Sequence, residues 1–155
     1  MKIRNVVLTV VLCLLVLSVC YAAENPNMGT WKLNEAKSKI PAGVAKNTTV
    51  VYAPAGDMIK VTTAGVDGSG NPTHSEWTGK FDGKPYPVTG MTTVDARAVT
   101  AKGDRTLEID NMKGGKSVGT GKVELAKDGK SRTLETEGTS PDGKKVHAKF
   151  VYDKQ

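Results

Sequence analysis

The sequence predicts an all-β domain: an antiparallel up-and-down meander of about eight to ten strands, closed into a barrel, after an N-terminal signal segment. Three observations support this fold class. Apolar and polar residues alternate in short runs, Gly- and Asp-containing pairs separate these runs by about a dozen residues, and no window shows a sustained helical period. Without a helix-length crossover, consecutive strands pair antiparallel, and closure removes the unpaired edges of such a meander.

Each strand run has one predominantly apolar face. The residues predicted to face inward are, in chain order, Trp31, Leu33, Ile59, Val61, Thr63, Ser75, Trp77, Gly79, Phe81, Val94, Ala96, Ala98, Leu107, Ile109, Val123, Leu125, Leu134, Thr136, Val146, Ala148, Phe150 and Tyr152. Several of these are small, which indicates either an internal cavity or a flattened barrel with β-bulges.

The separators between runs are hairpin sequences. Asp-Gly pairs occur at 67–68, 82–83, 128–129 and 142–143, and Gly114-Gly115 fills another gap. Such pairs accept the positive φ angles that tight hairpin turns require. The segment 34–46 differs, because Asn34 is a predicted N-cap for one helical turn that Pro41 and Gly43 end. We expect an ordinary connection there; the alternative is a lid over one barrel mouth.

Residues 1–22 have the parts of a secretory signal peptide. A short basic head is followed by an apolar run from Val6 to Val19 and then by small residues. This run is shorter than the about 20 residues of a membrane-spanning helix, so we expect cleavage and no stable membrane span afterwards. The expected location is exported, either periplasmic or secreted. A lipoprotein is the alternative, because Leu17-Ser18-Val19-Cys20 resembles a lipobox, although Val19 replaces the usual Gly, Ala or Ser.

Residues 23–155 are expected to form a single β-barrel domain. These 133 residues keep 20 of the 22 basic side chains and all 16 acidic ones, a net charge of +4. Both cysteines, Cys13 and Cys20, lie in the signal, so the mature domain has no disulfide and no thiolate chemistry. The domain must therefore hold together by core packing and strand pairing.

The basic balance does not indicate a nucleic-acid surface. Only three arginines follow the signal, the aromatic residues lie on the apolar strand faces, and nucleic-acid binding requires clustered basic residues with aromatics between them. The lysines fall mostly beside predicted turns, where solvated charge protects strand edges. These lysines are Lys102, Lys113, Lys116, Lys127, Lys130, Lys144 and Lys145.

Gly29-Thr30-Trp31 at the start of the first strand resembles the Gly-x-Trp signature of lipocalins and related calycin barrels. The resemblance implies that Trp31 lies inside the closed end of the barrel under a basic side chain from near the last strand, for which Lys149 is the nearest match. The stretches 29–34, 36–39, 86–90 and 151–154 are also similar to a group of exported bacterial lipocalin-like proteins of unknown function. This similarity implies a fold and a compartment but no activity.

The sequence indicates no catalytic residues, no metal site and no cofactor, so the protein is not expected to be an enzyme. His74 and His147 are predicted on polar strand faces, and metal sites require several convergent donors. Ser75 is predicted inward, but no histidine or carboxylate is expected beside it to act as a base.

The predicted ligand-binding residues are inward apolar and aromatic side chains. They are Tyr52, Ile59, Val61, Trp77, Phe81, Phe150 and Tyr152, with Gly29 and Trp31 as the structural signature. Two functions remain open. The protein binds a small apolar molecule in the barrel, or it is a structural or interaction module of the cell envelope whose barrel is filled. The volume inside the barrel distinguishes them.

The signal segment predicts a mature N-terminus at Ala23, because Cys20 and Ala22 then occupy the two positions that must be small. The intact mass of the exported protein should correspond to an unlipidated chain that begins at Ala23. A mass that includes a diacylated Cys20 would show that the lipoprotein alternative is correct.

Overall fold

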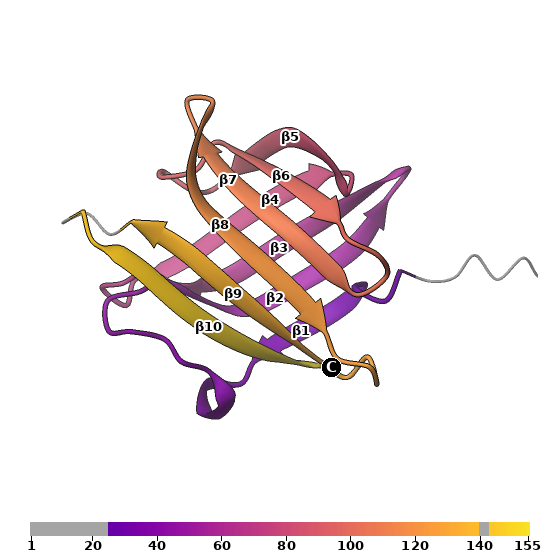
Figure 1. The fold of residues 1–155 in the computed structure, drawn as a ribbon, viewed down its shortest axis with the longest axis horizontal. Coiled ribbons are helices and arrows are strands. Elements are labelled where there is room, and N and C mark those ends of the chain that lie inside the picture. The colour runs from indigo at the N-terminus through magenta and orange to yellow at the C-terminus, as the bar shows by residue number, and fades with distance from the viewer. Residues whose placement is uncertain (1–24, 140–142) are drawn as a thin grey trace, which may run out of the picture.

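A computed structural model describes residues 25–139 and 143–155, so the predicted signal lies outside the described residues. The described residues form ten strands and one turn of 3-10 helix (Figure 1). In order, the elements are β1 (Gly29–Leu33), η1 (Glu35–Lys37), β2 (Lys46–Ala55), β3 (Met58–Val66), β4 (Pro72–Gly79), β5 (Asp82–Thr89), β6 (Ala96–Ala101), β7 (Thr106–Lys113), β8 (Lys116–Leu125), β9 (Ser131–Thr139) and β10 (Lys145–Lys154).

The strands form one closed antiparallel barrel in which every strand pairs with its neighbours in sequence. The last pairing joins β10 to β1, with Trp31 opposite Lys154 and Leu33 opposite Tyr152. The predicted fold class is therefore confirmed. Because consecutive strands run in opposite directions, alternate connections lie at opposite ends of the barrel. We call the end where β1 begins and β9 begins the closed end, and the end where β2 and β6 begin the open end.

Two strands do not follow the alternating pattern. In β2 the neighbouring Val50 and Val51 are both apolar, although Val50 is buried and Val51 only partly so. β5 contains Pro85 and Pro87, which lack the N–H that a central strand donates to its ladder. The pairing of β4 with β5 accordingly covers only Glu76 with Thr89 and Trp77 with Val88.

The predicted orientation of β6 is wrong. Ala98 pairs with Asp110 and is on the outer face of the strand. Arg97 pairs with Asn111 and lines the barrel interior. The same shift turns Ala96 outward, because it shares a strand face with Ala98. The inward face was predicted by alternation that began at Val94. Val94 is buried, but it lies in the irregular connection before β6 and not in the strand. A period of two cannot be carried through an irregular segment.

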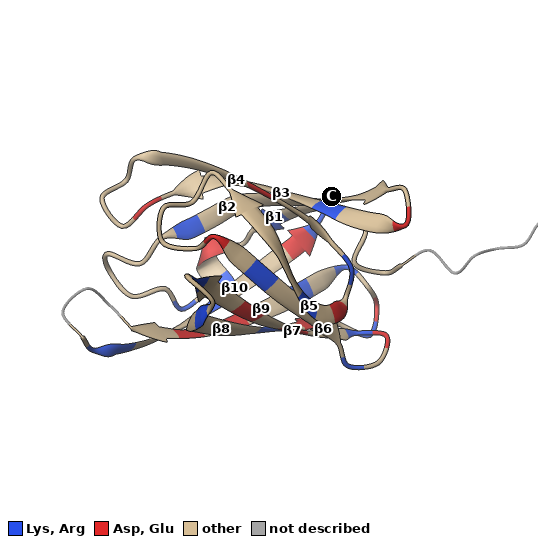
Figure 2. Cartoon of the chain, turned by 90° about the horizontal axis from the view of Figure 1, so that it is seen from above, with Lys and Arg blue, Asp and Glu red and all other residues tan. Residues whose placement is uncertain are grey.

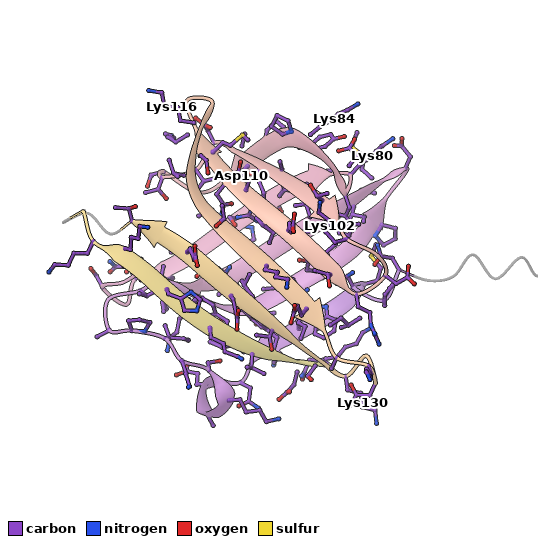
Figure 3. The ribbon with its side chains drawn as sticks, viewed as in Figure 1. Lys80, Lys84, Lys102, Asp110, Lys116 and Lys130 are labelled. Carbon is purple, nitrogen blue, oxygen red and sulfur yellow. The ribbon has the colours of Figure 1, made fainter. Side chains whose placement is uncertain are left out.

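Lysine, arginine and acidic residues are spread along the strands and at the connections (Figure 2). Lys116 and Lys130 mark the ends of two hairpins on opposite sides of the molecule (Figure 3). On the strands, Lys60 pairs with Glu76 at 3.0 Å and Lys149 with Glu135 at 3.5 Å, all with partly exposed side chains. Exposed pairs of this kind contribute little to stability, so their role is to keep the outer face solvated.

The segment between β1 and β2 is tied to the last strand. Asn34 caps η1 as predicted, since its side-chain oxygen accepts a hydrogen bond from Lys37 N at 3.2 Å. The Ser38 hydroxyl accepts from Val151 N at 2.9 Å, and Lys39 forms a backbone bridge with Lys149. The segment therefore extends the β1–β10 closure instead of folding over the mouth. Only its last residues, Val44 and Ala45, line the interior.

Trp77, Phe81 and Tyr86 form an aromatic cluster where β4 meets β5. The Trp77 and Phe81 rings are stacked with centroids 6.2 Å apart, and Tyr86 meets Trp77 edge-on at 6.0 Å. Gly79 lies among these rings, and a Cβ atom there would approach Trp77 Cζ2 and the Tyr86 ring to 2.6 Å. The rings can pack closely only because this position has no side chain.

Gly79→Ala should therefore destabilise the barrel by about 1–3 kcal/mol, the usual cost of overpacking. Gly138→Ala is the matched control, because its added Cβ would meet nothing closer than Val118 O at 4.0 Å. Denaturant unfolding followed by tryptophan fluorescence measures both. Equal midpoints for the two variants would contradict the packing described for this cluster.

Candidate ligand site in the barrel interior

Trp31 closes one end of the barrel. Its side chain is fully buried, and its indole Nε1 donates a hydrogen bond of 2.9 Å to the backbone oxygen of Asn27. Asn27 is itself buried, and Met28 packs against the core beside it. The residues just before β1 thus cover the closed end beneath the indole.

Arg132 lies over Trp31 from the first part of β9. Its guanidinium carbon is 4.5 Å from the centroid of the Trp31 ring, 4.6 Å from that of Tyr52 and 5.4 Å from that of Tyr152. Only 3% of Arg132 is exposed. Three aromatic faces therefore stabilise a cation that is almost removed from water.

The prediction that Lys149 lies over Trp31 is wrong. Lys149 points outward with 41% of its side chain exposed and pairs with Glu135. Two other basic side chains lie over Trp31: Arg132 comes from β9, the strand that pairs with β10, and Lys154 comes from β10 itself, with its Nζ 5.3 Å from the ring centroid. Lys149 was selected because it lies in the last strand. The pairing register instead places Arg132 of the neighbouring strand opposite Tyr152 and thus on the inner face.

Arg132 has unused hydrogen-bonding capacity. Its Nε and Nη1 atoms are buried and have no hydrogen-bond partner among the described residues. Neighbouring Tyr152 is buried too, and its hydroxyl donates to the backbone oxygen of Asn47 at 3.0 Å. Burial raises the pKa of the Tyr152 phenol, and the nearby Arg132 charge opposes that shift only in part. Tyr152 is therefore neutral and does not balance the charge of Arg132.

A cavity of about 280 Å³ lies inside the barrel between Arg132 and the open end. Its volume is near the lower limit of about 300–1,000 Å³ that is usual for small-molecule sites. The apolar part of its wall is formed mainly by Val50, Val61, Ile109, Val123, Leu134 and Phe150. At the open end, the wall is completed by Val44, Ala45 and Met91, and 38% of Met91 is exposed.

The structure divides the predicted ligand-binding residues into two groups. Tyr52, Val61, Phe150 and Tyr152 line the cavity. Ile59, Trp77 and Phe81 do not line it: Trp77 and Phe81 belong to the aromatic cluster, and Ile59 packs against the core. Tyr52 joins the two regions, because its ring also meets Phe81 edge-on at 6.5 Å.

Sequence reasoning missed the arginines of the wall. Arg97 enters it from β6 and donates from Nε to the Asn111 side-chain oxygen at 2.7 Å, and its Nη2 lies 3.9 Å from the sulfur of Met91. Burial lowers the pKa of the Arg97 guanidinium, although such a group stays protonated. Thr63 and Thr136 add hydroxyls, and the Thr63 oxygen lies 2.7 Å from that of Ser75. Thr63 and Thr136 were predicted to face inward, but a charged residue in a strand is expected to face solvent, so only the register could have identified the two arginines.

The cavity wall is positively charged. Among the residues that the structure describes, those around the cavity include two arginines and no aspartate or glutamate. The nearest acid to Arg97 along the chain, Asp95, is instead engaged with Gly114 N at 2.9 Å and Lys113 at 3.9 Å. Neither arginine forms an ion pair within the described part of the chain.

The histidines lie outside this site. The His74 side chain is 61% exposed, and its Nε2 lies 3.7 Å from Glu76 Oε1. The His147 side chain is 60% exposed, and its Nδ1 lies 3.9 Å from Glu137 Oε1. In residues 25–139 and 143–155, no three His, Cys, Asp or Glu side chains gather into a possible metal site. No helix over the same residues has the length and apolar character to cross a membrane.

In comparisons with known proteins, the chain matches no family model and no curated relative. The barrel is consistent with the lipocalin resemblance at the level of architecture: a closed antiparallel meander with a buried tryptophan at the start of its first strand.

Trp31→Ala should reduce the free energy of unfolding by about 3–5 kcal/mol, because it removes a fully buried ring and exposes the underside of Arg132. Lys149→Met, on the outer face, should change it by less than about 0.5 kcal/mol. Urea unfolding of the purified variants measures both effects.

A double-mutant cycle identifies the cation that contacts Trp31. Trp31→Leu and Arg132→Met should be coupled by about 0.5–2 kcal/mol, whereas Trp31→Leu and Lys149→Met should be additive. Coupling to Lys149 and not to Arg132 would contradict the packing at the closed end.

Proposed function

We propose that this protein is an exported, lipocalin-like carrier or receptor that binds a small, largely apolar molecule inside its barrel. The observation that supports binding is the internal cavity: the barrel is closed, yet about 280 Å³ between Arg132 and the open end is not filled by side chains. A filled barrel would favour a structural module. Export is supported by the signal-like composition of residues 1–22.

The wall of the cavity suits a ligand with an apolar body. Eight aliphatic and aromatic side chains from β2, β3, β7, β8, β9 and β10 face it. Burial of apolar surface contributes about 25 cal/mol per Å², so a ligand that buries roughly 300 Å² gains several kcal/mol before association costs are subtracted. The expected affinity is therefore micromolar. The small volume favours a single ring or a short chain over a long-chain lipid.

Thr136→Phe should block binding, because Thr136 lines the cavity from β9 and a phenyl ring would occupy part of it. Thr120→Phe is the matched control, since Thr120 is exposed on the outer face of the neighbouring strand β8. Calorimetric titration with indole, benzyl alcohol and hexanol should give saturable binding to the wild type and to Thr120→Phe. Binding to Thr136→Phe should be at least about tenfold weaker.

Absence of saturable binding by every compound of the panel would contradict the proposal and favour the structural module. Unchanged binding in Thr136→Phe would show that the ligand lies elsewhere. A native mass spectrum of the protein from its own host addresses the natural ligand directly, because a retained molecule adds its mass to that of the chain.

A further inference from the structure

We infer that the ligand of this barrel carries a negatively charged carboxylate, and that Arg132 at the closed end binds it. This inference rests on the proposed ligand-binding function and adds the chemical class of the ligand. The arrangement that supports it is a buried guanidinium with unpaired donors at the inner end of a largely apolar cavity.

Arg132 is the first part of the argument. An arginine that is 3% exposed has lost nearly all of its hydration, and a buried charge without a partner is costly. The guanidinium carbon lies over the rings of Trp31, Tyr52 and Tyr152. Rings recover part of the lost solvation but accept no in-plane hydrogen bond, so Nε and Nη1 stay without partners. An anion in the cavity would provide both the missing acceptor and the missing charge.

The second part is the absence of competing charge. Within the described residues, no carboxylate lines the cavity, so nothing there neutralises Arg132 or repels an incoming anion. Arg97 adds a second positive charge towards the open end, and its Nε is already occupied by Asn111. The potential along the cavity is therefore positive from the mouth inward, which attracts an anion and guides it to the unpaired donors of Arg132.

Size and geometry favour a carboxylate over larger anions. The planar guanidinium matches a planar carboxylate in hydrogen-bond geometry. A cavity of about 280 Å³ must hold the acidic group together with its apolar body, which matches a small aromatic acid or a short-chain acid. In this orientation the apolar body contacts Val61, Val123 and Phe150.

The test compares ligands that differ only in charge. Benzoate should bind wild-type protein at least about tenfold more tightly than benzamide, and hexanoate at least about tenfold more tightly than hexanol. Equal affinities within each pair would overturn the inference and leave the proposed function standing. Failure of all four compounds to bind would contradict the proposed function itself. Phenyl phosphate that binds more tightly than benzoate would overturn the assignment to a carboxylate.

Variants locate the charge that is responsible. In Arg132→Met, the ratio of benzoate to benzamide affinity should fall to about one, whereas a purely structural role would weaken both ligands and leave the ratio unchanged. Arg105→Met is the matched control, because it removes the same charge from an exposed residue at the closed end and should keep the ratio. If Arg132→Met does not fold, the wild-type ligand pairs still test the preference for a carboxylate. Arg97→Gln then separates the two arginines: relative to wild type, the affinity for benzoate should fall by a smaller factor than the rate constant of association. A ratio that survives in a folded Arg132→Met protein would overturn the inference.

Discussion

The pairing of β1 with β10 is the constraint on which the rest of the structure depends. It turns an open meander into a barrel, so that every strand has two neighbours and one face of each strand becomes interior. It also brings residues separated by most of the chain into contact: Trp31 lies opposite Lys154 in the ladder, and Arg132 and Tyr152 are opposite one another in the neighbouring ladder. Without this closure Trp31 would not have the guanidinium of Arg132 above it.

Closure does not fill the interior evenly. At the closed end, two groups of large side chains meet through Tyr52: the rings around Arg132, and the cluster of Trp77, Phe81 and Tyr86. Towards the open end the wall has smaller residues such as Gly121 and Thr136, and the cavity begins there. The same barrel thus has a packed base that provides stability and a hollow part that is available to a ligand. This division explains why Trp31 and Trp77, although both are buried, do not border the cavity.

The electrostatic asymmetry follows from the same geometry. Acidic residues form exposed pairs with lysines, such as Glu76 with Lys60 and Glu135 with Lys149, whereas the cavity wall holds two arginines and, among the described residues, no acidic side chain. Exposed pairs are weak because water screens them, but an unpaired interior cation is felt strongly because the surrounding medium screens it poorly. The two buried arginines therefore influence what can bind far more than the overall charge of the chain does.

The sequence by itself determined the all-β class, the approximate strand number, the Asn34 cap and most of the inward residues, because these depend on local alternation and turn chemistry. It also placed Trp31 in a buried position and four of the cavity residues, Tyr52, Val61, Phe150 and Tyr152, on the inner face. Tertiary structure alone decided the orientation of Arg97 and the choice of Arg132 over Lys149, because register across an irregular connection and between strands is a long-range property. It also decided that Ile59, Trp77 and Phe81 lie outside the cavity wall, since alternation shows which face a residue occupies but not how high it lies along the barrel axis.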